Sequence, residues 1–164
     1  TATGAYALPR AMVAAKNLGV PQLSPEMLAG MYLQEGRPDM GANFIDVSKG
    51  ASNALYYDLT EKHNVDGPTA RFLVLLKEKQ DLADRLKIPF GRAWNGTGDS
   101  GYQTGAEYAK NLQRQITAAQ LPENKQLLDT VRLGMEHGAQ YPYVIPEQRE
   151  AYLRNRQGLA ALLK

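Results

Sequence analysis

Apolar residues recur along the chain at the three- and four-residue spacing of an amphipathic helix, and the strict alternation of a strand is nearly absent. Proline and glycine divide this pattern into segments. The spacing predicts helices over 6–18, 25–35, 47–62, 68–86, 106–118 and 123–137, with a polar helix running on toward Lys164. We therefore expect an all-α fold without internal repeats.

Several predicted helices have characteristic start and stop residues. Ser24 and Pro25 are typical of an N-cap and a first helical position, and Gly36 lies just past the predicted end. Pro9 fits in the first turn of the first helix, and Gly138 fits as the C-cap of the sixth. Glycine-rich stretches predict loops over 36–45 and 89–105.

Composition narrows the possible classes of function. The chain has 164 residues, 43% of them hydrophobic and 22% charged, which suits a single domain over 1–164 with a real core. Without cysteine, and with only two distant histidines, His63 and His137, we expect no metal site and no cofactor. No apolar run approaches the roughly 20 residues of a membrane-spanning helix. The net charge of +2 comes without a dense basic block, which argues against nucleic acid and is compatible with an anionic cell wall.

Glu35 is the first candidate for chemistry. Leu28, Met31, Tyr32 and Glu35 are spaced so that the carboxyl group shares a helix face with three apolar side chains. Desolvation and the helix C-terminus both raise the pKa of a carboxyl group there, as a glycosidase general acid requires. The alternative is an ordinary helix-end Glu that points to water or pairs with Arg37.

The sequence from Gly96 to Gly101 matches the G-x-G-x-x-G pattern of dinucleotide-binding loops. That pattern requires a preceding strand and a βαβ unit, and the chain offers neither. We therefore do not expect a nucleotide site.

A more informative interpretation takes 92–98 as a turn that presents Trp94 beside Asn95. Aromatic rings stack on pyranose sugars, and amides bind their hydroxyl and N-acetyl groups. Tyr102 and Tyr108 follow on or near the next helix, where they can reach the same site. The alternatives are a core role for Trp94, turn chemistry for Asn95 and ordinary packing for Tyr108.

A helix-terminal Glu35, the turn Ala93-Trp94-Asn95-Gly96 and then Tyr108-Ala109 together resemble the lytic transglycosylases and goose-type lysozymes. The resemblance covers about 23–112, and it looks most like muralytic domains inside bacteriophage virion proteins. It implies a lysozyme-like fold, and we expect the chain to be a domain excised from a larger protein. The chain departs from the family in having Gly36 where Ser or Thr is usual, Trp94 for the usual Tyr, and 41–46 in place of the Gly-Leu-Met-Gln-like segment.

The resemblance implies cleavage of the β-1,4 bond between N-acetylmuramic acid and N-acetylglucosamine in peptidoglycan, with Glu35 as acid. A lytic transglycosylase needs this one carboxyl group, whereas a true muramidase needs a second. Asp46 and Asp39 are the candidates for the second acid, although Asp46 also fits as the cap of the helix predicted over 47–62. Because no second acid is clear, we favour the transglycosylase.

The expected partners are peptidoglycan glycan strands and other domains of a larger virion or cell-wall protein. The expected location is a virion, with action in the bacterial periplasm or cell wall. Two other classes stay open: a non-catalytic glycan-binding or structural module, and a helical interaction domain in which Trp94 only packs. Glycan binding without turnover would indicate the non-catalytic module. The absence of any saccharide binding would indicate the helical interaction domain.

Overall fold

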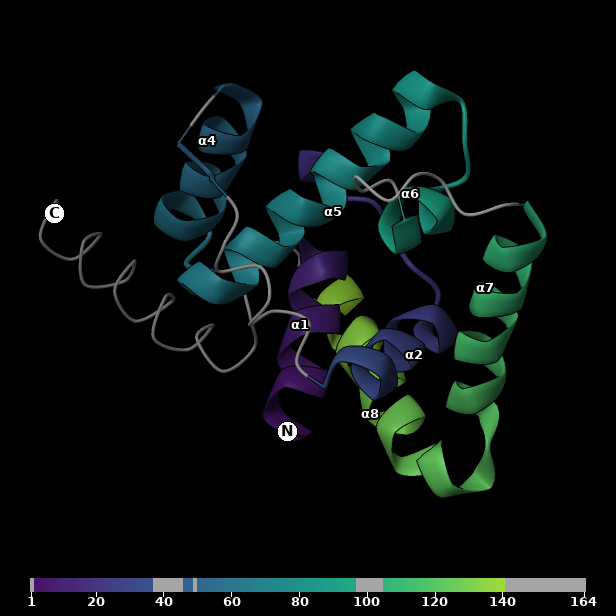
Figure 1. Ribbon diagram of the computed structural model, residues 1–164. Coiled ribbons are helices and arrows are strands. Elements are labelled where there is room, and N and C mark those ends of the chain that lie inside the picture. The colour runs from purple at the N-terminus through teal and green to yellow at the C-terminus, as the bar shows by residue number, and fades with distance from the viewer. Residues whose placement is uncertain (1, 37–45, 49, 97–104, 141–164) are drawn as a thin grey trace, which may run out of the picture.

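The computed structural model describes residues 2–36, 46–48, 50–96 and 105–140, and within these ranges the regular structure is entirely helical (Figure 1). The all-α prediction is therefore confirmed. The elements, in chain order, are α1 (Ala2–Ala14), η1 (Lys16–Leu18), α2 (Pro25–Glu35), α4 (Gly50–Tyr57), η3 (Asp58–Lys62), α5 (Gly67–Leu86), α6 (Phe90–Gly96), α7 (Gly105–Gln120), η4 (Pro122–Asn124) and α8 (Lys125–Gln140).

Helices α1 and α8 lie side by side at the centre of the molecule, and their backbones come unusually close (Figure 1). Gly134 and Gly138, one turn apart on α8, face the carbonyl oxygens of Tyr6 and Arg10 on α1. A Cβ atom at either glycine would lie well inside van der Waals contact with those oxygens. Only glycine therefore permits this approach.

This packing corrects two predictions. Gly138 is not a C-cap but a buried interior residue of α8, which continues to Gln140. Pro9 is not in the first turn, because α1 begins at Ala2 and includes Pro9 in its interior. The Pro9 ring is buried against Gly134, so packing offsets the backbone hydrogen bond that proline cannot make.

Helix α2 crosses this pair and is fastened at its start. The Ser24 side chain accepts a hydrogen bond from the Met27 N–H at 3.1 Å, so the predicted N-cap is confirmed. Glu26, in the first turn, forms an ion pair with Arg132 of α8 at 2.8 Å. The Tyr32 hydroxyl donates to the Gly4 carbonyl oxygen at 2.5 Å, which ties the last turn of α2 to the start of α1.

Helix α5 supplies much of the core. Asp66 caps it through the Thr69 N–H at 3.1 Å, and Phe72, Leu73 and Leu76 are fully buried. The helix is the long teal one in Figure 1, with α4 packed toward one end and α6 toward the other.

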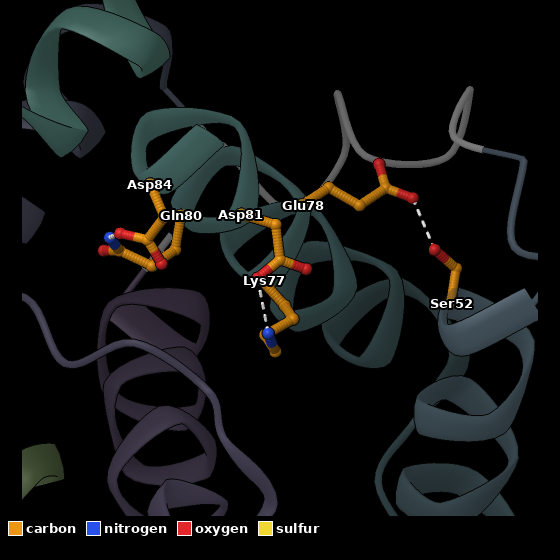
Figure 2. A network of polar contacts seen from close by, with 6 residues as sticks. All are labelled: Ser52, Lys77, Glu78, Gln80, Asp81 and Asp84. Carbon is orange, nitrogen blue, oxygen red and sulfur yellow. Dashed lines mark hydrogen bonds and ion pairs between the residues drawn. The ribbon is translucent and has the colours of Figure 1, made fainter. Parts of the chain in front are cut away.

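Polar side chains on the solvent side of α5 form hydrogen bonds and an ion pair, and one of these contacts joins α5 to α4. The Ser52 hydroxyl donates to Glu78 Oε1 at 2.6 Å, which joins the two helices (Figure 2). Lys77 and Asp81 form an ion pair along the surface of α5 itself. These contacts are partly or fully exposed, so we assign them only a small share of the stability.

Two predicted boundaries are wrong. The helix expected over 47–62 is described from Gly50, continues as α4, and ends in the π-helical turn η3. The turn expected over 92–98 is instead helical through Gly96, as α6. Helix α6 packs on α5, so tertiary contacts stabilise a short helix that local glycines do not favour.

None of the helices in the described ranges is both long enough and apolar enough to cross a membrane.

The glycine contact between α1 and α8 gives a stability prediction. In an open helix, Gly→Ala stabilises by about 0.5–1 kcal/mol. At Gly138 the added methyl meets backbone that cannot move aside, so we expect Gly138→Ala to destabilise by about 1–3 kcal/mol. Urea denaturation followed by circular dichroism measures the difference.

Gly67→Ala is the matched control, because a Cβ atom there would meet only the ends of the Tyr56 and Arg71 side chains, at 3.4 and 3.5 Å. We expect it to change the free energy of unfolding by less than about 0.5 kcal/mol. Equal effects of the two substitutions would contradict the close packing of α1 on α8.

Candidate functional site

The candidate site is built on the C-terminal half of α2. Leu28, Met31 and Tyr32 are buried, so the apolar face predicted for this helix is confirmed. Glu35 is the last residue of α2, one turn beyond Met31 and Tyr32. Its side chain lies outside the described residues, so its position is known only through the helix backbone that carries it.

Gly36 ends the helix in a backbone conformation that favours glycine. Its φ is +74°, and its N–H donates to the Tyr32 carbonyl oxygen at 2.8 Å. Ser or Thr at this position would be strained, because side chains with a Cβ atom rarely adopt positive φ. Glycine here therefore follows from how the chain leaves α2.

A second glycine brings α7 against the same half of α2. A Cβ atom at Gly30 would lie 2.7 Å from the Gln115 carbonyl oxygen, so the two backbones approach closely. The side-chain amide of Gln115 donates a hydrogen bond to Gln34 Oε1 across this contact. The position next to Glu35 is thus held by a buried residue of α7.

Beside this contact is a groove of about 340 Å³ between α2 and α7. We call it the α2–α7 groove. It is lined by Gly30, Leu33, Gln34, Asn111, Arg114, Gln115 and Ala118.

A second groove, of about 410 Å³, borders the other side of the α2 terminus. It is lined by Ala5, Tyr32, Gly36, Glu123, Asn124, Gln126, Leu127 and Thr130. Glu35 is therefore flanked in the chain by Gln34, which lines the first groove, and by Gly36, which lines the second.

The two grooves share a chemical character. Side-chain amides occur in both, and the second also has a hydroxyl group from Thr130. Amides and hydroxyls exchange hydrogen bonds with the hydroxyl and N-acetyl groups of a sugar. Each lining also holds one charged side chain, Arg114 in the first groove and Glu123 in the second.

Trp94 packs on two aromatic residues of the core. Its ring lies 6.1 Å from Phe90 in a stacked arrangement and 5.7 Å from Phe72 edge-on. It packs against the hydrophobic core while remaining partly exposed. These contacts favour the core role that the sequence left open, and the predicted role in substrate binding stays a prediction.

The other predicted residues are described only in part. Asn95 belongs to α6 and Tyr108 to α7, but their side chains are not among the parts that the structure describes. Tyr102 and Asp39 lie outside the described residues. Asp46 is exposed, and its Oδ1 atom accepts hydrogen bonds from the Ser48 N–H at 2.9 Å and from the Ser48 hydroxyl. Asp46 therefore forms a local turn and does not cap a helix that starts at residue 47.

Two titratable groups away from the end of α2 have shifted pKa values. A backbone hydrogen bond and the Arg132 side chain lower the pKa of Glu26. Burial lowers the pKa of His63, and this effect outweighs the opposing attraction of Asp58. Neither group lines a groove at the end of α2, so both shifts concern stability.

Sequence reasoning missed two features of this part of the molecule. One is the cluster between α1 and α8, where the Tyr6 hydroxyl and His137 Nδ1 are hydrogen-bonded and the Arg10 guanidinium lies 3.8 Å from the Tyr6 ring centre. The other is the set of α7 residues in the α2–α7 groove. A mid-helix glycine at position 30 was the available signal for the groove, because such a glycine often marks a close helix contact.

Comparisons of the chain with protein-family models, with curated proteins and with solved structures find no match.

The packing of Trp94 predicts a large-to-small effect on stability. We expect Trp94→Ala to destabilise the protein by about 2–4 kcal/mol, because it leaves a void against Phe72 and Phe90. Trp94→Phe retains an aromatic ring there and should cost less than about 1.5 kcal/mol. Denaturation followed by circular dichroism compares the two, and a negligible cost for Trp94→Ala would contradict the core role.

The shifted pKa of His63 predicts a pH dependence of stability. At high pH the imidazole is neutral in both states. As pH falls below about 6.5, the unfolded chain binds a proton that the folded protein still resists, so stability is lost until the lower folded pKa is passed. Thermal unfolding between about pH 8 and pH 5 should show a smaller loss for His63→Gln than for the native protein. Identical pH profiles would contradict this assignment.

Proposed function

We propose that this chain is a lysozyme-like, peptidoglycan-cleaving enzyme, and specifically a lytic transglycosylase in which Glu35 is the catalytic acid and then the base. One observation carries the proposal. Glu35 ends a helix in which Leu28, Met31 and Tyr32 are buried. Its two neighbours in the chain, Gln34 and Gly36, each line an amide-bearing groove.

The chemistry follows from that position. A carboxyl group at a helix C-terminus, beside an apolar face, is favoured in its protonated form. Protonated Glu35 donates its proton to the oxygen between N-acetylmuramic acid and N-acetylglucosamine as that bond breaks through an oxocarbenium-like transition state. The resulting carboxylate then removes the proton of the muramic 6-hydroxyl, which attacks the anomeric carbon and forms an anhydro product.

The state of Asp46 supports the route with a single carboxyl group. Its Oδ1 atom is engaged by Ser48 in an exposed turn, an ordinary structural use of an aspartate. A true muramidase that used Asp46 or Asp39 as second acid is the alternative enzyme. In either case we propose a virion- or wall-associated protein that acts on glycan strands in the bacterial envelope.

Glu35→Gln is the direct test. The amide keeps the size of the side chain but cannot donate the proton, so release of soluble fragments from purified peptidoglycan should fall by roughly 10²-fold or more. Glu61→Gln is the matched control, because Glu61 is exposed on η3 and lines neither groove. Both variants should unfold at the native midpoint. Normal turnover by Glu35→Gln would eliminate the mechanism, and binding without turnover by the native protein would favour the non-catalytic module.

Product masses separate the two enzyme classes. We expect anhydromuramic ends, and we expect Asp46→Asn to release fragments at close to the native rate. Reducing ends in mass spectra, together with a loss of activity in Asp46→Asn, would instead identify a hydrolase that uses Asp46.

A further inference from the structure

We infer that Tyr57, where α4 ends and the π-helical turn η3 begins, is the centre of a separate, non-catalytic sugar-binding surface. The ligand is a chain of pyranose sugars, one ring of which stacks on the exposed tyrosine ring. The choice of wall glycan as that chain rests on the proposed function, whereas the surface itself is independent of Glu35.

Tyr57 is unusual among the aromatic residues in its exposure. It is 48% exposed, more than any other large hydrophobic side chain in the described ranges. The other described aromatic side chains are buried or half-buried: Tyr6, Tyr32, Tyr56, Phe72, Phe90 and Trp94. An aromatic ring left in water forgoes the free energy of burial, and a ligand that stacks on the ring recovers part of it.

The exposed ring is supported by the residue before it. The rings of Tyr56 and Tyr57 meet edge-on with 5.7 Å between their centres. Tyr56 packs against the hydrophobic core, and the Arg71 guanidinium lies 5.4 Å from the centre of its ring. Tyr57 is therefore held against an anchored neighbour, and a ring already in position loses little conformational entropy when a ligand binds.

The backbone beneath Tyr57 is fastened on both sides. Near the start of α4, the Ser52 hydroxyl donates to Glu78 Oε1 of α5 at 2.6 Å (Figure 2). After Tyr57 the chain continues as η3, in which Leu59 is fully buried. Such π-helical turns are rare and occur frequently at functional sites.

The neighbours of the ring on α4 suit a sugar. Ala54 and Asn53 precede Tyr57 by three and four residues, so they share its side of the helix. Ala54 is exposed and its methyl group is too short to cover the ring. The Asn53 amide nitrogen donates to the Ser48 carbonyl oxygen at 3.3 Å, which leaves the amide oxygen to accept from a sugar hydroxyl. We call Asn53, Ala54 and Tyr57 the Tyr57 surface.

Other classes of ligand suit the Tyr57 surface less well. The nearby cations are engaged, because Lys62 forms an ion pair with Asp58 at 3.0 Å and Arg71 lies against the Tyr56 ring. Phosphates of nucleic acids and anionic lipids need cations that are not already neutralised. A protein partner needs a broad apolar centre, and within α4, which is described throughout, Tyr57 is the only large apolar side chain that is exposed.

The Tyr57 surface is remote from the grooves beside Glu35. Helix α4 packs on α5, whereas the two grooves are lined by residues of α1, α2, α7, η4 and α8 and by Gly36. Figure 1 shows α4 and α7 on opposite sides of the molecule. A second contact with the same polymer raises the effective concentration of substrate at the first, so the Tyr57 surface holds the enzyme on an insoluble glycan without entering the chemistry.

Sedimentation with insoluble glycan tests the inference in the Glu35→Gln protein, which does not consume its ligand if the proposed function holds. We expect Tyr57→Ala to weaken binding to purified peptidoglycan by about three- to tenfold, and Tyr57→Phe to retain it because the ring is kept. Chitin, which has N-acetylated sugars without peptides, should show the same dependence on Tyr57. Leu133→Ala is the matched control, because it removes a side chain of α8 that is 46% exposed, and it should bind as the parent protein does.

Turnover by the active protein separates the Tyr57 surface from the catalytic site. Tyr57→Ala should slow the release of fragments from insoluble peptidoglycan by about three- to tenfold and leave the cleavage of short, soluble glycan fragments at the native rate, since a short fragment gains nothing from a second contact. An equal loss on both substrates, or unchanged binding of Tyr57→Ala to peptidoglycan and chitin, would overturn the inference and leave the proposed function standing. Binding to glycan that depends on Tyr57 in a protein that cleaves neither substrate would eliminate the proposed function and support the surface.

Discussion

The close contact between α1 and α8 is the constraint on which the rest of the described structure depends. Gly134 and Gly138 let two helix backbones meet without side chains between them, so that Pro9 is buried and the Tyr6–His137 pair is part-buried at the same interface. Such contacts gain dispersion energy over many atoms and tolerate almost no added volume. Helix α2 packs across this pair of helices, whose relative position the glycine contact determines.

A close backbone contact at a glycine also occurs between α2 and α7, at the candidate site. Gly30 brings α7 against α2 as the α8 glycines bring α8 against α1. Because the backbones are close, the polar side chains at the edge of the contact, Gln34 and Gln115, meet and leave a groove beside them. The site is thus a consequence of helix packing, in which small residues determine the spacing and amides determine the chemistry.

The proposed enzyme depends on the way in which α2 ends. In the proposed mechanism, the helix C-terminus and the buried face of Leu28, Met31 and Tyr32 are the two features of α2 that would favour a protonated carboxyl group at Glu35.

Local sequence signals determined the all-α class, the core face of α2 and the ends of that helix, because capping by Ser24, Pro25 and Gly36 and the spacing of Leu28, Met31 and Tyr32 are properties of a single segment. Glu35 as the acid was likewise proposed from that segment alone. Only the tertiary structure decided that Gly138 is buried rather than a cap, that Pro9 lies inside α1, and that Trp94 belongs to a helix packed on Phe72. It alone also brought Arg114 beside Gln34. These outcomes depend on contacts between segments far apart in the chain, and no local pattern encodes which neighbour a residue will meet.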